Sequence, residues 1–358
     1  MITITGKYTN ANIMTDIVEP DVIKQVTQLC NHPLFEGKKI CLMADVHPSK
    51  ATCVGLSCEI DTQHIIPQLL GTDLCCTISA WEIKGKENDW KKLDKVIKNM
   101  KIYPPKNILN WMQALCNYNN LNLRDYTGTW ATIGSGNHFV SVEQGQNRYL
   151  IIHSGSRNLG QDIAISWAKK AYEENPYRHS GEEKQLAWLG RDNSIIYKAE
   201  LQDLRYIVET AHTYMAEYIC KEMKWKIQDE IICPHNFIDG NILHKGSIAM
   251  NAKMLGIIPI NMADGSLIVR GYTAARHDLY NYSAPHGAGR VLKRSECKEQ
   301  LSMKEYKQRM KNVFSSNVST STIDESPMAY KPIEQIKESI EPICEIVDEL
   351  KPVYNYKE

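Results

Sequence analysis

The sequence predicts an α+β protein with a central mixed or antiparallel β-core and helices on the outside. Short apolar runs end repeatedly in Gly or Asn turns, and two pairs of runs, at 139–152 and 256–271, are close enough to form hairpins. Stretches with apolar residues three and four apart predict helices between and beyond them. The chain has no internal repeat and no linker that divides it, so we expect one domain spanning residues 1–358.

The amino-acid composition limits the classes of function that this chain could have. The chain has 42 Lys and Arg residues and 42 Asp and Glu residues, so its formal net charge is zero. The overall electrostatic field therefore does not attract nucleic acid, and a polyanionic substrate would need a local patch of positive charge. The 11 cysteines, an odd number that includes the adjacent pair Cys75-Cys76, indicate reduced thiols. No run approaches about 18 apolar residues, and the N-terminus does not resemble a signal sequence. We expect a soluble, cytoplasmic protein with no membrane segment.

The N-terminal part begins with a helix and continues with two strands. Apolar residues at helical spacing from Glu19 to about Asn31, with Pro20 in the first turn, indicate a helix that packs on the core. Residues 38–60 then form a strand that runs into Asp45-Val46-His47, followed by a strand rich in Val and Cys. Sites often lie just past strand ends, although an ordinary turn explains Asp45 and His47 equally well.

Residues 65–78 are expected to form a buried strand interrupted by a turn that contains Asp73 and Cys76. A carboxylate and a thiolate three residues apart can converge on one ion, and the mixed pair suits manganese, cobalt or zinc better than calcium. A buried free cysteine beside a turn aspartate is the ordinary alternative. Helical spacing follows within 88–123, and we expect these helices to cover the strands of the site.

Histidines stand at the ends of several further strands. A glycine turn leads through His138 into one strand, and the next strand along the chain leads into His153. If the two strands pair in antiparallel fashion, both imidazoles lie within reach of one metal. After helices predicted over 162–173 and 201–225, another strand ends at His235. The following His-Lys-Gly-Ser does not have the residue order of a phosphate-binding Walker loop.

The C-terminal part is expected to contain two strands between Gly256 and Gly271, a helix and an exposed loop over 295–324, and an amphipathic helix over 333–350. Between them, His286 lies between a proline and a Gly-Ala-Gly run. Small neighbours allow a bulky group to approach the ring and free backbone N–H groups to face an anion. Arg290 adds a planar double donor that suits phosphate.

Together these positions form a candidate metal set with one histidine left over. The set is Asp73, Cys76, His138, His153 and His235. It exceeds what one tetrahedral ion needs, so a Cys76 that bridges two ions is the natural hypothesis. His286 then has a separate role, because a neutral imidazole can attack phosphorus and form a phosphoramidate that passes its phosphoryl or nucleotidyl group on.

The motifs in their order along the chain resemble the RtcB family of RNA ligases, the GTP-dependent enzymes of tRNA splicing and RNA repair. They are MADVH, GTDLCC, GSGNHF, HSGSR, HNF, SAPHGAGR and ESPMAYK. The resemblance implies an RtcB-like fold and an enzyme that joins RNA 2′,3′-cyclic phosphate or 3′-phosphate ends to 5′-hydroxyl ends with GTP and manganese. Its expected partners are RNA with broken ends, such as tRNA, and archease as an activator.

The resemblance also implies roles for individual residues. His286 becomes guanylylated, Asp73, Cys76 and His138 hold one Mn²⁺, and Cys76, His153 and His235 hold the other. Asp45, Arg157, Arg290 and Tyr330 support the site. The guanylate pocket is built from Asn137, Asn236, Pro259, Ile260, Asn261, Met262, Ser266, Gly287, Ala288, Gly289 and Lys357.

Three departures from the family pattern leave alternatives open. Ser141 stands where the family usually has a glutamate, with Glu143 on the same strand face as a candidate replacement, so GTP and ATP are both open as cofactors. Cys75-Cys76-Thr77 replaces Gly-Cys-Gly, and Pro48 replaces a glycine-rich continuation. A metal-dependent phosphodiesterase or phosphatase of RNA ends, and an inactive RNA-end binder, are the alternative functions. Zinc fits the same ligands as manganese.

Overall fold

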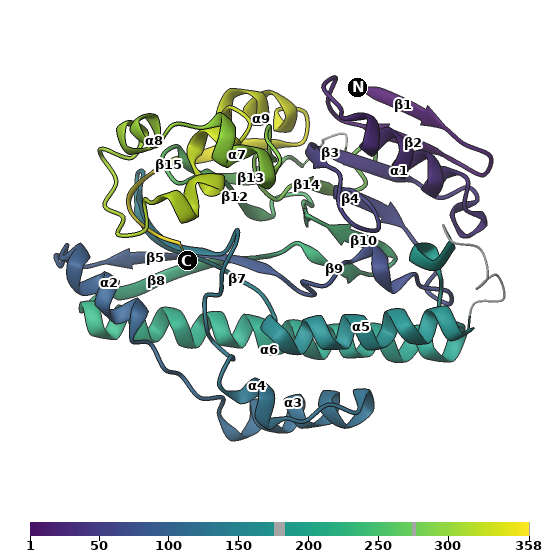
Figure 1. Ribbon diagram of the computed structural model, residues 1–358, viewed down its shortest axis with the longest axis horizontal. Coiled ribbons are helices and arrows are strands. Elements are labelled where there is room, and N and C mark those ends of the chain that lie inside the picture. The colour runs from purple at the N-terminus through teal and green to yellow at the C-terminus, as the bar shows by residue number, and fades with distance from the viewer. Residues whose placement is uncertain (175–182, 274–276, 358) are drawn as a thin grey trace.

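The computed structural model describes residues 1–174, 183–273 and 277–357, and it confirms the α+β class (Figure 1). The first sheet has the order β1-β2-β3-β4-β10-β9, and its strands are Ile2–Thr5, Asn10–Ile13, Ile40–His47, Val54–Glu59, Ile242–Lys245 and Asn236–Asp239. The second has the order β12-β13-β15-β6-β7-β5-β8, and its strands are Leu255–Asn261, Gly265–Gly271, Cys344–Tyr356, Phe139–Gln144, Arg148–Ser154, Thr77–Lys84 and Lys226–Pro234. A ribbon pairs β11 (Ser247–Ala249) with β14 (Ser283–Pro285).

Helices lie on both sides of these sheets (Figure 1). The long helices α5 (Arg157–Glu174) and α6 (Arg191–Met223) run side by side under the second sheet, and α6 contacts β5, β7 and β8. The remaining α-helices are α1 (Pro20–Cys30), α2 (Trp90–Lys98), α3 (Lys106–Asn119), α4 (Arg124–Thr127), α7 (Arg294–Gln300), α8 (Met303–Arg309) and α9 (Ile333–Ile340). Short 3₁₀ turns occupy Pro33–Phe35, Pro67–Leu69, Glu183–Leu186, Thr320–Glu325 and Pro327–Ala329.

Strand pairing is antiparallel between all neighbours in the described residues except β2 and β3, which run parallel. Both expected hairpins are present as β6–β7 and β12–β13. The apolar stripe of α6 packs in the core as expected, with Ile207, Met215 and Ile219 buried. The prediction of a mixed or antiparallel β-core with helices outside is therefore confirmed.

The C-terminal prediction was wrong beyond Ile340. Helix α9 ends there, and residues 344–356 form strand β15 instead of continuing the helix. Apolar residues at 343, 347 and 350 fit a helical spacing, but β15 is inserted between β13 and β6 and hydrogen-bonds to both. Hydrogen bonding of β15 to a strand on each side outweighs the helical spacing of its apolar residues. Pro352 lies at a shift in the register between β15 and β6.

Two shorter predictions also needed correction. Residues 65–70 are not a strand, because Pro67 begins a buried 3₁₀ turn, and the strand starts only at Thr77. The Ser/Thr-rich end of 295–324 is not simply an exposed loop. It leads into the 3₁₀ turn Thr320–Glu325, in which Thr322 and Ile323 are buried.

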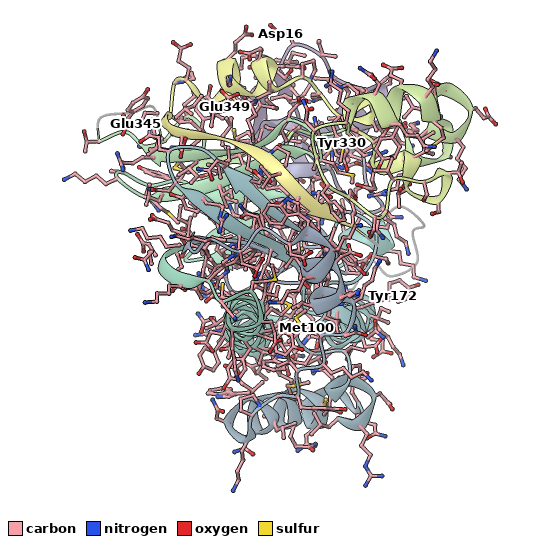
Figure 2. All side chains as sticks on the ribbon, turned by 90° about the vertical axis from the view of Figure 1, so that its left-hand side faces the viewer. Asp16, Met100, Tyr172, Tyr330, Glu345 and Glu349 are labelled. Carbon is pink, nitrogen blue, oxygen red and sulfur yellow. The ribbon has the colours of Figure 1, made fainter. Side chains whose placement is uncertain are left out.

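Helix α3 does not cover the site strands as expected. It packs on α5 and α6, which separate it from the second sheet, and it forms the outermost layer in both views (Figures 1 and 2). Its apolar residues Ile108, Met112 and Leu115 are buried against those helices rather than against strands.

No helix in the described parts of the chain is both long enough and apolar enough to span a bilayer. All 11 cysteines are free and buried, in agreement with the expectation of reduced thiols.

Candidate active site

Four neighbouring strands bring the candidate ligands to one end of the second sheet. Cys76 directly precedes β5, His138 directly precedes β6, and His235 directly follows β8. His153, near the end of β7, is paired with Ile78 of β5 and Phe139 of β6. Because β5, β6, β7 and β8 are adjacent and antiparallel, residues far apart in sequence lie side by side at this end.

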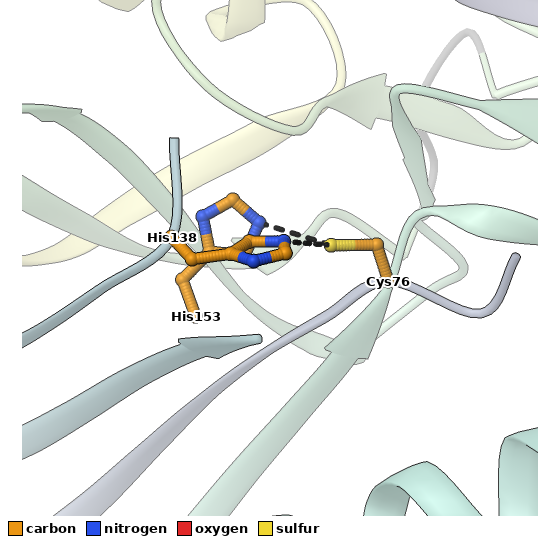
Figure 3. A group of neighbouring side chains, drawn as sticks. All are labelled: Cys76, His138 and His153. Carbon is orange, nitrogen blue, oxygen red and sulfur yellow. Dashed lines mark hydrogen bonds between the residues drawn. The ribbon is translucent and has the colours of Figure 1, made fainter. Parts of the chain in front are cut away.

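Cys76 is the centre of a compact group of potential ligand atoms (Figure 3). Its Sγ lies 3.3 Å from Nε2 of His138 and 3.3 Å from Nε2 of His153. The carboxylate of Asp73 joins the group, with Oδ2 3.2 Å from Nε2 of His138. One thiol, two imidazoles and a carboxylate thus point to one place, an arrangement that a borderline divalent ion would satisfy.

Two further imidazoles, those of His235 and His286, lie next to this group. The ring centroids of His153 and His235 are 5.1 Å apart, and those of His235 and His286 are 4.8 Å apart. Nδ1 of His235 is buried and has no hydrogen-bond partner in the described residues, so it is a free donor atom that a bound ion could use. The five candidate ligands and His286 therefore share one site.

Burial favours the neutral form of two of these imidazoles, His153 and His235. Burial lowers the pKa of His153 and of His235 well below the usual value, and neighbouring histidines lower both further. Neutral rings keep the lone pairs that metal binding requires. Burial, together with the Asp73 carboxylate, raises the pKa of Cys76 well above the usual value. Binding of a divalent cation would oppose this shift, because metal ligation requires the thiolate.

Local backbone geometry explains how the loops reach this place. Gly134 and Gly136 have φ angles of 85° and 79° in the turn before His138. A Cβ on Gly155 would lie 2.2 Å from Oδ1 of Asp73, so only glycine lets the β7–α5 connection pass the carboxylate. Cys75 adopts a φ of 57°, a conformation that favours glycine, and its buried Sγ contacts the carbonyl of Leu201.

Asp45 and His286 form the second part of the site. Nδ1 of His286 lies 2.7 Å from Oδ2 of Asp45, and the same oxygen accepts the backbone N–H groups of His286 and Gly287 at 3.2 and 3.3 Å. Asp45 is fully buried. Because a carboxylate only accepts, the Nδ1 of His286 carries a hydrogen, which in the neutral ring leaves the lone pair on Nε2. Gly289 allows the close approach, since a Cβ there would lie 2.5 Å from the carbonyl oxygen of Asp45.

Most residues expected around a nucleotide line one cavity of about 1180 Å³, which also contains His286. The expected residues on this wall are Asn137, Asn236, Pro259, Ile260, Asn261, Met262, Gly287, Ala288, Gly289 and Lys357. Ser266 is not on the wall. It is buried on β13 opposite Pro259.

Two of the asparagines on this wall have side chains with structural partners. Asn236 donates to the carbonyl of Asp73 at 2.8 Å and accepts from the N–H of Gly246 at 2.9 Å, so it fixes the metal loop. Asn261 accepts the N–H groups of Ala263 and Asp264, both at 2.9 Å. Direct contact of these two side chains with a ligand would require them to give up those bonds.

Three of the residues expected to support the site, Arg157, Arg290 and Tyr330, lie in two separate groups of contacts. Arg157, at a φ of 55°, donates to Nδ1 of His138 at 3.1 Å. This bond puts the hydrogen of a neutral His138 on Nε2, toward Asp73 and Cys76, so binding of an ion through Nε2 would require His138 to give up the bond to Arg157. Arg290 donates to the carbonyl of Asp324 at 2.6 Å and stacks on Tyr330 with 5.2 Å from the guanidinium carbon to the ring centroid. Glu325 joins this second group, because the Lys357 ammonium and the Tyr330 hydroxyl both bond to its carboxylate.

Sequence reasoning missed two residues of the site. Lys245 lines the cavity, is buried, and donates to Ser49 Oγ and the Thr52 carbonyl, both at 3.1 Å. Burial lowers its pKa to about 8. The residue order around Lys245 differs from that of a Walker loop, and the lysine nevertheless lines the cavity. The other is Glu325, which begins the ESPMAYK motif but was not assigned to the site.

Comparisons with known proteins agree with these observations. The family model described as tRNA-splicing ligase RtcB matches residues 110–358. The RNA-splicing ligase RtcB1 of Escherichia coli ATCC 25922 is 27% identical over 397 aligned positions, which cover 94% of each chain. The RNA-splicing ligase RtcB of Escherichia coli K12 is 26% identical over 394 positions, again covering 94% of each. The tRNA-splicing ligase RtcB of Nanoarchaeum equitans is 25% identical over 261 positions, covering 57% of this chain and 54% of that protein.

Proposed function

The chain belongs to the RtcB family, and on that premise we propose that it is an RNA ligase that joins 2′,3′-cyclic phosphate or 3′-phosphate ends to 5′-hydroxyl ends with GTP and Mn²⁺. The single observation that carries the proposal is the placement of His286. Its Asp45-bound ring lies 4.8 Å from that of His235, beside the Cys76 group, in one cavity large enough for a nucleotide and an RNA end. We further propose that residues 1–358 act as one catalytic domain in the cytoplasm.

Two manganese ions would be held by side chains that share Cys76. Asp73, Cys76 and His138 would bind one ion, and Cys76, His153 and His235 the other. Bound at this end of the sheet, the ions would neutralise phosphate charge and polarise the phosphorus that is attacked. The fit is supported by Sγ of Cys76, which lies 3.3 Å from Nε2 of both His138 and His153, and by the buried Nδ1 of His235, which has no hydrogen-bond partner in the described residues.

In the proposed reaction His286 is the nucleophile. Asp45 holds the Nδ1–H, which directs the Nε2 lone pair toward the α-phosphorus of GTP, so that a P–N bond forms while pyrophosphate leaves. An RNA 3′-phosphate then takes the guanylate from Nε2, and the 5′-hydroxyl displaces GMP to close the RNA strand. A cyclic end must first be opened by water to give the 3′-phosphate.

Positive side chains around the cavity would position the polyphosphate and the RNA. Lys357, Arg290 and Arg294 line the cavity and gather around Glu325, and Lys245 also lines it, although the whole chain carries no net charge. Lys357 is held by Glu325, an acid whose own pKa stays below its usual value because the charges of Lys357 and Arg294 outweigh the effect of burial. This local patch would supply the binding that overall charge cannot.

An assay with RNA that carries a 2′,3′-cyclic phosphate and RNA that carries a 5′-hydroxyl, with GTP and Mn²⁺, tests the proposal. We expect joined RNA from the wild type and from His64→Ala, which changes a partly exposed histidine outside the cavity, and none from His286→Ala. Opening of the cyclic phosphate without joining would replace the ligase with a phosphodiesterase. Binding of RNA ends without any reaction would leave an inactive binder. Addition of archease tests whether joining requires an activator.

A further inference from the structure

A buried histidine of helix α6 reaches the strand that carries the candidate ligand His153. His212 is fully buried, and α6 packs under β5, which follows Cys76, and β7, which contains His153 (Figure 1). Nε2 of His212 lies 3.2 Å from the carbonyl oxygen of Ser154, the residue after His153. A carbonyl oxygen only accepts, so Nε2 carries a hydrogen and donates it to Ser154.

The other ring nitrogen of His212 is held as well. Nδ1 lies 2.8 Å from Oγ of Ser79 on β5, and this Oγ accepts the indole N–H of Trp81 at 2.9 Å. Burial lowers the pKa of His212 to about 4, so the neutral ring offers the lone pair of Nδ1 to the Ser79 hydroxyl. The hydrogen bonds therefore run in one direction, from the indole to the carbonyl of Ser154.

The same carbonyl of Ser154 lies beside the thiol of Cys76. Sγ of Cys76 is 3.8 Å from this oxygen. The residue before Ser154 also contacts the sulfur, because Nε2 of His153 is 3.3 Å from Sγ. A shift of Ser154 would therefore move both a ligand ring and a carbonyl dipole relative to the sulfur.

Metal binding changes the charge at this contact between sulfur and oxygen. A thiol can donate its hydrogen to the carbonyl of Ser154, but the thiolate that binds a metal cannot, and the negative end of the carbonyl dipole repels it. The Nε2–H of His212 presents a positive end to the same oxygen and offsets part of this repulsion. In a buried site, where the dielectric constant is low, such dipole effects are strong.

We propose that His212 is a positioning residue of the proposed metal site: it holds the Ser154 carbonyl and so favours the metal-bound thiolate of Cys76. Ser79 orients the imidazole for this role. His212 acts through the backbone and does not itself bind the ion. The inference rests on the proposed function, since it concerns the metal site that the proposed ligase would use.

Titration of the metal-free full chain with Co²⁺ tests the inference, because Co²⁺ bound to a thiolate gives a sulfur-to-metal charge-transfer absorption band. The amide nitrogen of glutamine is as many bonds from Cβ as Nε2 of histidine, whereas that of asparagine matches Nδ1. His212→Asn therefore loses the donor to Ser154, and we expect it to weaken Co²⁺ binding by about tenfold or more. His212→Gln keeps a donor at this place and should bind Co²⁺ much more tightly than His212→Asn.

Ser194→Ala is the matched control, because Ser194 is a buried, hydrogen-bonded residue of the same helix, about 27 Å from His212 along the helix axis. It should leave the Co²⁺ affinity unchanged. Ser79→Ala is a second test variant, which keeps the imidazole but frees its Nδ1, and it should also weaken Co²⁺ binding. Thermal denaturation shows which variants are folded, and Ser79→Ala decides the matter if His212→Asn does not fold.

Equal Co²⁺ affinities of His212→Asn and His212→Gln, or wild-type affinity in Ser79→Ala, would overturn the inference. Absence of Co²⁺ binding by the wild type would overturn the inference and the proposed metal site together. Co²⁺ binding that depends on His212, without RNA joining in the ligase assay, would support the inference while the ligase proposal fails. RNA joining with a Co²⁺ affinity that does not depend on His212 would overturn the inference alone.

Discussion

Oδ2 of Asp45 accepts three N–H groups from His286 and Gly287, so one carboxylate oxygen sets both the ring tautomer and the loop that carries it. In Asp45→Asn the amide oxygen can still accept from Nδ1–H, but the charge that stabilises the ring during attack is gone. We expect the rate of covalent guanylate transfer to His286 to fall by about 10- to 100-fold with little change in the KM for GTP. Quench-flow measurement of protein-bound label gives both quantities. A change in KM alone would show that Asp45 only shapes the pocket.

The Sγ atom of Cys76 lies 3.3 Å from Nε2 of His138 and 3.3 Å from Nε2 of His153. If its thiolate serves two ions, Cys76→Ala should lower bound manganese more than His138→Ala or His153→Ala does. Elemental analysis of the purified variants measures this directly. Cys233→Ala, a buried cysteine on β8 outside the ligand set, is the control. Manganese content in Cys76→Ala equal to that of the wild type would refute the bridging role.

At the scale of the strand, β15 brings the C-terminal residues into the site. Lys357 directly follows β15, lines the cavity and is buried in an ion pair with Glu325, whereas Lys351 on the same strand is exposed and outside the cavity. We expect Lys357→Met to weaken GTP binding by about 10-fold or more, and Lys351→Met to leave it unchanged. Calorimetry measures the affinity, and circular dichroism confirms that Lys357→Met is folded. Equal affinity of the two variants would remove Lys357 from the nucleotide site.

Strand β6 buries Glu143, and this burial raises the pKa of its carboxyl group to about 7, against smaller opposing effects of Ser141, Ser266 and Lys351. The unfolded chain ionises this group near its ordinary value of 4.5, so the folded state loses stability as pH rises from about 4.5 to about 7. The loss is on the order of 3 kcal/mol above that range.

Glu143→Gln removes this penalty. We therefore expect its melting temperature, relative to the wild type, to increase between pH 5 and pH 8 in the absence of nucleotide. Thermal denaturation at several pH values measures the difference. Glu345→Gln, on an exposed carboxyl, should show no such trend. A stability difference for Glu143→Gln that does not depend on pH would contradict the burial argument.

At the scale of the whole molecule, the sequence predicted features that depend on local pattern. The β6–β7 hairpin and the histidines at its neighbouring ends follow from alternation and a glycine turn, and the structure places His138 and His153 on the same thiol. The helical spacing of α6 likewise predicted its buried stripe.

Features that depend on contacts between distant segments could not be predicted in this way. Asp45 and His286 are 241 residues apart, and nothing near either residue indicates the pairing. Residues 344–356 have helical spacing over part of their length, but they form a strand because the sheet has a place for it between β13 and β6. Lys245 enters the site only through the fold, since it stands in no motif that local pattern identifies, and the contact of Glu325 with Lys357 depends on the C-terminal strand that carries Lys357 into the site.

The central claim is that His286 is a nucleophile that receives guanylate from GTP. Peptide mass spectrometry of the full chain after incubation with GTP and Mn²⁺ tests it most directly. The account predicts a GMP adduct on His286, absent in His286→Ala, retained in His64→Ala, and lost from the wild type when RNA with a 3′-phosphate is added. RNA joining by the wild type without any adduct on His286, or an adduct on another residue that persists in His286→Ala, would contradict the account.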